Sequence, residues 1–122
     1  MPDNRRVSQF AGVLKKEISI IIDRKVKDPE KGFVTVNYVK VSPDLKIASI
    51  YYTVLGDEAQ REKSAAALKR SAGFIRNELK PVIKSRWLPE LRFFYDDTID
   101  QAEKINRLID KLHEDSPGNE AS

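Results

Sequence analysis

Two segments rich in β-branched and aromatic residues, 33–41 and 45–55, constrain the fold of this chain more than any other feature. Ser42, Pro43 and Asp44 lie between them, and this short run has turn chemistry and no helical alternative. Apolar residues alternate with polar ones along both segments, as in strands that have one buried face and one exposed face. The sequence therefore predicts a β-hairpin whose apolar face is covered by another layer.

Tyr51 lies on the predicted exposed face of the second strand. Ordinary packing against neighbouring strand residues is the favoured interpretation of a tyrosine at such a position. Stacking on a nucleic-acid base is the alternative.

The segment 5–27, which precedes the hairpin, has the pattern of an amphipathic helix. Its apolar residues recur every three or four positions and form one stripe: Val7, Phe10, Ala11, Leu14, Ile18, Ile21, Ile22 and Val26. Asp28 and Pro29 end this helix, because the residue before a proline is pushed out of the α region. We expect the stripe to pack on the core.

A long helical run follows the hairpin, with Asp57 as its N-cap. Gly73 lies inside this run, where glycine costs about 1 kcal/mol relative to alanine, and this favours a break at residues 71–73. A continuous helix that admits one glycine for close packing is the alternative. The second part, 74–86, contains Pro81, which predicts either a kink or an early end of the helix.

Residues 91–95 alternate as a third strand, 96–98 form a turn, and the apolar residues between Ile99 and Leu112 predict a last amphipathic helix. Residues 1–114 are therefore expected to form one domain, followed by a short disordered acidic tail at 115–122. The predicted fold class is α+β, in the order α-β-β-α-kink-α-β plus a C-terminal helix. A three-stranded sheet carries the helices on one face.

The composition of the 122-residue chain excludes several classes of protein. The absence of cysteine rules out a disulfide framework, a thiolate zinc site and a cysteine nucleophile. No apolar run approaches the length of a membrane span, and the N-terminus lacks the apolar segment of a signal peptide. We expect a cytoplasmic protein that has no membrane partner.

The net charge of +3 hides an uneven distribution. Residues 61–92 hold nine Lys or Arg against three Asp or Glu, whereas residues 93–122 hold three against eight. A basic body beside an acidic end suggests an anionic partner, most often a nucleic acid. Ordinary solvated helix faces are the alternative and, on charge alone, the favoured interpretation.

The predicted break at 71–73 coincides with a group of cations, Lys69, Arg70 and Arg76. A helix that begins there has unpaired backbone N–H groups and the positive end of its dipole beside these side chains. This combination is typical of phosphate-binding sites.

The order of elements resembles a type II KH domain, an RNA-binding fold that usually has a Gly-x-x-Gly loop between two helices. This chain has no two glycines three residues apart. It resembles instead the ribosome-binding factor A family, bacterial small-subunit assembly factors in which an interhelical kink of the form Ala-x-Gly replaces that loop. Ser71-Ala72-Gly73 stands at the kink here, with serine in the first position, where its hydroxyl is suited to cap the following helix.

The resemblance extends over nearly the whole chain as an ordered set of short matches. The matching positions are Arg5-Arg6-Val7, Lys27-Asp28-Pro29, Val39, Val41-Ser42, Asp44-Leu45, Leu55, Gly73-Phe74-Ile75-Arg76, Arg86, Pro89-Glu90-Leu91 and Phe93-Phe94-Tyr95-Asp96.

The family resemblance implies a monomeric, non-enzymatic factor without a cofactor or a metal. It implies binding to the immature small (30S) ribosomal subunit and its 16S rRNA. The implied role is late subunit maturation and processing of the 5′ end of 16S rRNA, with importance in cold adaptation and assembly GTPases as candidate partners.

We expect RNA to bind at the kink, where backbone donors and surrounding cations meet phosphates. The candidate RNA-binding residues are Arg5, Arg6, Lys15, Lys16, Lys69, Arg70, Ser71, Ala72, Gly73, Arg76, Lys80, Lys84 and Arg86. Two other classes remain as alternatives. One is a module whose basic face binds an acidic protein. The other is an enzyme that uses His113 or a metal at Asp96-Asp97. This is the least favoured, because His113 has no apparent nucleophile beside it and the two aspartates stand where a turn needs such residues.

Overall fold

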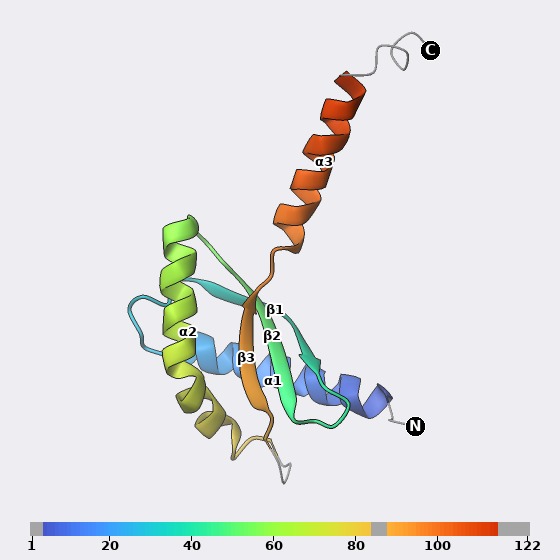
Figure 1. Ribbon diagram of the computed structural model, residues 1–122. Coiled ribbons are helices and arrows are strands. Elements are labelled where there is room, and N and C mark those ends of the chain that lie inside the picture. The colour runs from blue at the N-terminus through green and yellow to red at the C-terminus, as the bar shows by residue number, and fades with distance from the viewer. Residues whose placement is uncertain (1–3, 84–87, 115–122) are drawn as a thin grey trace.

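The computed structural model describes residues 4–83 and 88–114. Their elements follow the predicted order, and Figure 1 shows their arrangement in space. The bounds are α1 (Asn4–Arg24), β1 (Val34–Val41), β2 (Ile47–Val54), α2 (Glu58–Leu79), β3 (Glu90–Tyr95) and α3 (Thr98–Glu114). The α+β fold class is therefore confirmed.

The sheet is mixed, with β2 in the centre. β1 pairs antiparallel with β2 across the predicted hairpin, with a register shift between Val36 and Tyr38. β3 pairs with β2 in parallel, from Ile47 opposite Glu90 to Tyr52 opposite Tyr95. A parallel neighbour requires a crossover, and α2 supplies it.

The core lies between one face of the sheet and the two helices α1 and α2. Alternate residues of β2, from Ala48 to Val54, point into it, as the period of two predicted. The largest side chains that are fully buried from the helices are Leu14, Ile18 and Ile22 of α1 and Leu68, Ile75 and Leu79 of α2. The predicted stripe of the first helix therefore packs on the sheet, as expected.

α2 is continuous from Glu58 to Leu79, so the predicted break at 71–73 is wrong as a helix end. The last turns of α2 lean away from the direction of the first ones (Figure 1), yet no new helix begins at Gly73. Leu68 and Ile75 are fully buried on either side of the glycine, and each contributes about 1.5–3 kcal/mol, more than glycine costs. A Cβ at Gly73 would meet nothing within 4 Å, so close packing does not explain the glycine either.

Pro81 lies just after α2, because the helix ends at Leu79 with Lys80 as its C-cap. Of the two outcomes open for this proline, the structure has the early end. The predicted continuation to residue 86 is therefore wrong, and residues 84–87 lie outside the described ranges.

α3 does not lie on the sheet beside the other two helices, although the sequence expects the helices on one face. It extends away from the sheet (Figure 1), and none of its residues is buried. Its apolar residues still form a stripe, as predicted, and the large ones are exposed: Ile99, Ile105, Leu108, Ile109 and Leu112. The tail predicted at 115–122 lies outside the described residues.

Candidate nucleic-acid interface

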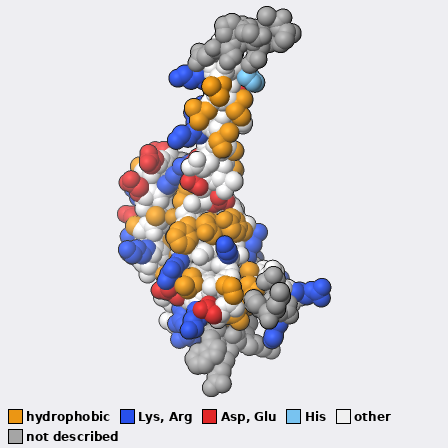
Figure 2. Space-filling view, turned by 45° about the vertical axis from the view of Figure 1, so that its right-hand side comes forward, with side chains coloured by type: hydrophobic (Ala, Val, Ile, Leu, Met, Phe, Trp, Pro, Cys, Tyr) orange, Lys and Arg blue, Asp and Glu red, His pale blue; other side chains and the backbone are white. Residues whose placement is uncertain are grey.

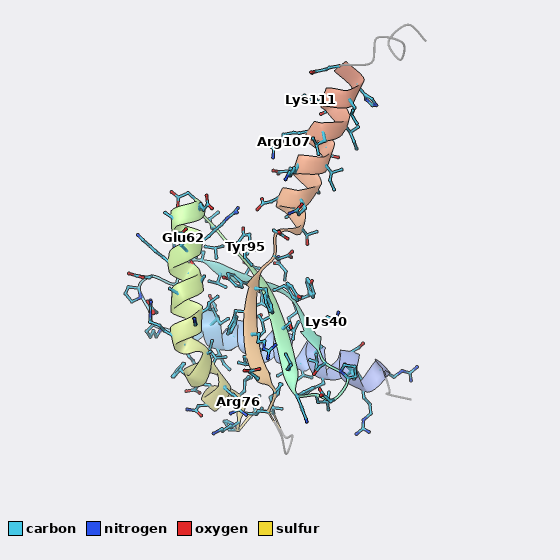
Figure 3. All side chains as sticks on the ribbon, in the orientation of Figure 1. Lys40, Glu62, Arg76, Tyr95, Arg107 and Lys111 are labelled. Carbon is cyan, nitrogen blue, oxygen red and sulfur yellow. The ribbon has the colours of Figure 1, made fainter. Side chains whose placement is uncertain are left out.

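A cavity of about 570 Å³ lies where the C-terminal half of α2 meets the start of β3. Ala72, Gly73 and Arg76 line it from α2, Lys46 from the residue before β2, and Glu90 from β3. Figure 3 shows Arg76 at this lower end of α2, beside the start of β3. The structure thus brings three of the predicted RNA-binding residues to one cavity.

Arg76 has a structural role as well as a charge. Its Nη2 donates to the Leu88 carbonyl at 3.1 Å and its Nε to the Pro89 carbonyl at 3.3 Å. These bonds hold the segment that leads into β3 against α2. Carbonyl oxygens carry no net charge, so the guanidinium remains a full cation at the mouth of the cavity.

Lys46 is a cavity residue that the sequence reasoning missed. The parallel register places it there, because the Lys46 carbonyl accepts the Glu90 N–H at 2.8 Å where β3 begins. Among residues 4–83 and 88–114, the Lys46 ammonium forms no ion pair at close range. It acts on the Asp44 carboxylate from further away: the pKa of Asp44 is lowered mainly by the Ser42 hydroxyl and the Lys46 N–H and, to a smaller extent, by the Lys46 charge. A lysine two residues after the predicted turn was the only local signal, and it did not indicate a neighbour 44 residues later.

Arg70 does not point a free charge at the cavity. Its Nη2 lies 2.9 Å from Asp28 Oδ2 and 3.5 Å from Glu30 Oε2, so two carboxylates neutralise it. The N–H of Glu30 and the Arg70 guanidinium hold the pKa of Asp28 below its ordinary value. Arg70 therefore ties α2 to the segment after α1, which is a structural role.

Five more predicted RNA-binding residues belong to this region of the chain. Lys69 and Lys80 are exposed, and Ser71 is half-buried on α2. The expected capping role of Ser71 is wrong, because the helix has no N-terminus there. Lys84 and Arg86 lie outside the described residues.

The predicted cations of α1 do not join the cavity as one surface. Lys25 pairs with Glu78 at 3.1 Å, so the C-terminal end of α1 is the end that meets α2. Arg5 and Arg6 lie at the opposite end of a helix about 30 Å long, and Lys15 and Lys16 are exposed between the two ends. The structure shows two separate groups of cations.

Asp96, one of the residues considered for an enzyme, has a structural role. Asp96 accepts bonds from Asn37 Nδ2 at 2.8 Å and from the backbone and hydroxyl of Thr98, and these bonds lower its pKa, with the Thr98 hydroxyl as the main cause. His113 is exposed in the last turn of α3. In the described ranges, no group of three or more acidic or histidine side chains is arranged to hold a metal ion.

No helix within those ranges has the length and apolar content to cross a membrane.

Tyr51 packs within the sheet face rather than standing alone. Its ring stacks on Tyr38 at 4.3 Å between centroids and on Phe94 at 5.5 Å. The favoured interpretation, ordinary strand packing, is therefore confirmed for Tyr51.

Comparison with known proteins identifies the family. The model of the family Ribosome-binding factor A matches residues 6–109. A relative named Ribosome-binding factor A, from Macrococcus caseolyticus, is 50% identical over 102 residues, which are 84% of this chain and 90% of the relative. The chain belongs to the ribosome-binding factor A family.

Solved structures of the same family share the fold. The crystal structure of ribosome-binding factor A from Thermus thermophilus has a TM-score of 0.65 and 26% identity, covering 73% of this chain and 94% of that one. A homology model of the Thermus thermophilus protein, fitted into a cryo-EM map of a complex with the 30S subunit, has a TM-score of 0.63 and 26% identity. It covers 74% of this chain and 94% of that one. The predicted KH-like fold is confirmed by this similarity.

Proposed function

We propose that this member of the ribosome-binding factor A family binds the small ribosomal subunit through ribosomal RNA, with the cavity between α2 and β3 as its main contact. The observation that carries the proposal is the pair of cations, Lys46 and Arg76, which meet at this cavity beside Ala72 and Gly73. The relative fitted into the map of a 30S complex supports the same class of partner.

The cavity suits a phosphate backbone for two reasons. Lys46 and Arg76 approach it from different elements, so two neighbouring phosphates can be neutralised at once. The lining that α2 contributes includes the small residues Ala72 and Gly73, and the space beside Gly73 is open, so a sugar-phosphate chain can come close to the backbone of α2. Glu90 also lines the cavity, and it forms an exposed ion pair with Arg92 at 2.8 Å, so its carboxylate is the one lining group that opposes an anion.

Lys46→Gln tests the charge contribution of the cavity. For each phosphate that is no longer neutralised, the slope of log affinity against log salt should fall by about 0.7–0.9. The measurement is co-sedimentation with free small subunits between about 50 and 200 mM salt. Lys63→Gln, an exposed lysine near the other end of α2, is the matched control and should leave the slope unchanged.

Two results would contradict this function. One is equal salt slopes for wild type and Lys46→Gln. The other is association that persists after nuclease has removed the RNA, which would point to a protein partner instead.

Gly73→Ala separates stability from binding. The added methyl group meets nothing in the fold, so the free energy of unfolding should rise by about 0.5–1 kcal/mol. If RNA approaches the backbone there, the same methyl group weakens subunit binding. Thermal unfolding and sedimentation on one preparation measure both effects, and unchanged binding would exclude close approach at Gly73.

We propose further that the protein acts as a monomer in the cytoplasm, on immature subunits, in late maturation and in processing of the 5′ end of 16S rRNA. Deletion of the gene should then increase 16S rRNA precursors with unprocessed 5′ ends, most strongly in the cold. Complementation by the wild type but not by Lys46→Gln would connect this role to the cavity. Suppression by overproduced assembly GTPases would identify them as functional partners.

A further inference from the structure

The face of the sheet turned away from α1 and α2 carries three aromatic side chains in one row. The register sets Tyr38 of β1, Tyr51 of β2 and Phe94 of β3 opposite one another. Figure 2 shows apolar side chains gathered in a band on this side of the molecule, with Lys and Arg side chains beside the band. Unlike the buried face, this face has no helix over it in the described part of the chain.

The three rings form a column with two open ends. The rings of Tyr38 and Tyr51 are nearly parallel, at an interplanar angle of 10°, and Phe94 continues the stack at 27°. Both faces of Tyr51 are occupied, because its neighbours come from the strands on either side. β1 and β3 are the edge strands, so Tyr38 and Phe94 end the column, and they remain 45% and 43% exposed.

A row of polar and cationic residues runs parallel to the aromatic column. Lys40, Ser49 and Arg92 are paired across the strands two residues from the rings, a spacing of about 7 Å along each strand. Arg92 pairs with Glu90, but both side chains are more than half exposed, and such pairs contribute little and exchange easily. Aromatic rings beside such cations are the combination that binds single-stranded nucleic acid.

We propose that this open face is a second RNA site, which takes unpaired nucleotides of the ribosomal RNA. A base stacks on the outer face of Phe94, and a second base on Tyr38, while Arg92 and Lys40 neutralise the adjoining phosphates. The inference rests on the proposed function, since it extends the same RNA contact. Paired bases are excluded by their own stacking, so the site selects single strands.

The position of Glu90 makes the two sites continuous. It lines the cavity of the proposed main contact, and it pairs with Arg92 on the open face. A strand that leaves the cavity at Glu90 therefore reaches Arg92 first and Phe94 two residues later. The cations beside the rings favour RNA over an apolar protein partner at this face.

The test uses Phe94→Thr in the full chain, with a labelled 12-nucleotide oligouridylate as the probe and fluorescence anisotropy as the readout. Loss of one stacked base should weaken binding about tenfold and leave the salt slope unchanged, because no ionic contact is removed. Arg92→Gln should instead reduce the slope. Phe33→Thr is the matched control, since Phe33 is 79% exposed but lies outside the column, and it should bind like the wild type.

Phe94→Leu keeps the apolar bulk without the ring and guards against a folding defect in Phe94→Thr; thermal unfolding monitors both variants. Wild-type affinity of a folded Phe94 variant would overturn the proposal, as would an equal loss in Phe33→Thr. Binding to small subunits that depends on Phe94 but survives removal of the RNA would assign the face to a protein and also overturn it. Sedimentation of Lys46→Gln tests the proposed function separately, so failure of one site does not imply failure of the other.

Discussion

α1 and α3 carry the same kind of apolar stripe, and the fold treats them in opposite ways. In α1, Leu14 and Ile18 are completely buried against the sheet. In α3, Ile99 and Leu112 remain 65% exposed, and no residue of the helix is buried. Helical periodicity indicates which residues share a face, but whether that face is covered depends on the path of the chain around it.

Both terminal helices are also tied to α2 by an arginine. The two ties differ in how many other contacts accompany them. Arg70 holds Asp28 and Glu30 just after α1, where buried Ser64 of α2 also donates to the Lys31 carbonyl at 2.6 Å. Arg61 holds Asp100 in the first turn of α3 at 3.0 Å, and its guanidinium lies over the Tyr95 ring. The ion pairs of Arg70 therefore add to a buried interface between α1 and the core. The ion pair of Arg61 holds α3 without a buried interface beside it.

Truncation of equivalent stripe residues should give the largest difference between the two helices. Ile18→Ala should lower the free energy of unfolding by about 2–5 kcal/mol, because it leaves a cavity in the core. Ile105→Ala in α3 should change it by less than about 0.5 kcal/mol, because Ile105 is exposed. Urea unfolding of both variants makes the comparison. A loss above about 1 kcal/mol for Ile105→Ala would mean that α3 is covered in solution.

Asp28→Asn should have a smaller effect that depends on pH. The folded pKa of Asp28 is lowered, so its carboxylate contributes stability above its unfolded pKa and loses that contribution as the pH falls through the folded value. The variant should therefore unfold at a lower temperature than the wild type at pH 7, and the difference should shrink as the pH falls below the ordinary aspartate value of 3.8. A difference that stays constant as the pH falls below 3.8 would contradict this ionic tie.

Asp100→Asn should have the smallest global effect. It removes an ion pair between partly exposed groups, which contributes about 0.2–1 kcal/mol. Its main consequence should be faster hydrogen exchange of the first turns of α3, with unchanged exchange in α1. Asp110→Asn, further along α3, is the control. Equal exchange in both variants would show that Arg61 does not hold the helix.

Features determined by nearby residues could be predicted from the sequence. The hairpin, the three strands and the Asp57 cap are confirmed, and the Asp57 carboxylate accepts the Gln60 N–H at 2.9 Å. Contacts between distant segments could not be predicted, because no local pattern encodes the partner. Arg70 is therefore neutralised by Asp28, 42 residues away, instead of facing phosphate.

The aromatic column and the position of Lys46 have the same origin. Both depend on β3 pairing in parallel with β2, and neither the side of β2 that it joins nor its register follows from the alternation of residues 91–95. The error at Gly73 is different in kind. Local helix propensity correctly indicated a cost, but the buried residues on either side outweigh it.

The central position of β2 also affects how the sheet forms while the chain is being synthesised. Its second neighbour, β3, begins 36 residues after β2 ends, so during synthesis at about 5–20 residues per second the edge of β2 stays unpaired for about 2–7 s. Such an edge is open to pairing with other chains until β3 arrives. Slower synthesis lengthens this interval, so the yield of native protein should depend on how quickly residues 55–95 are translated.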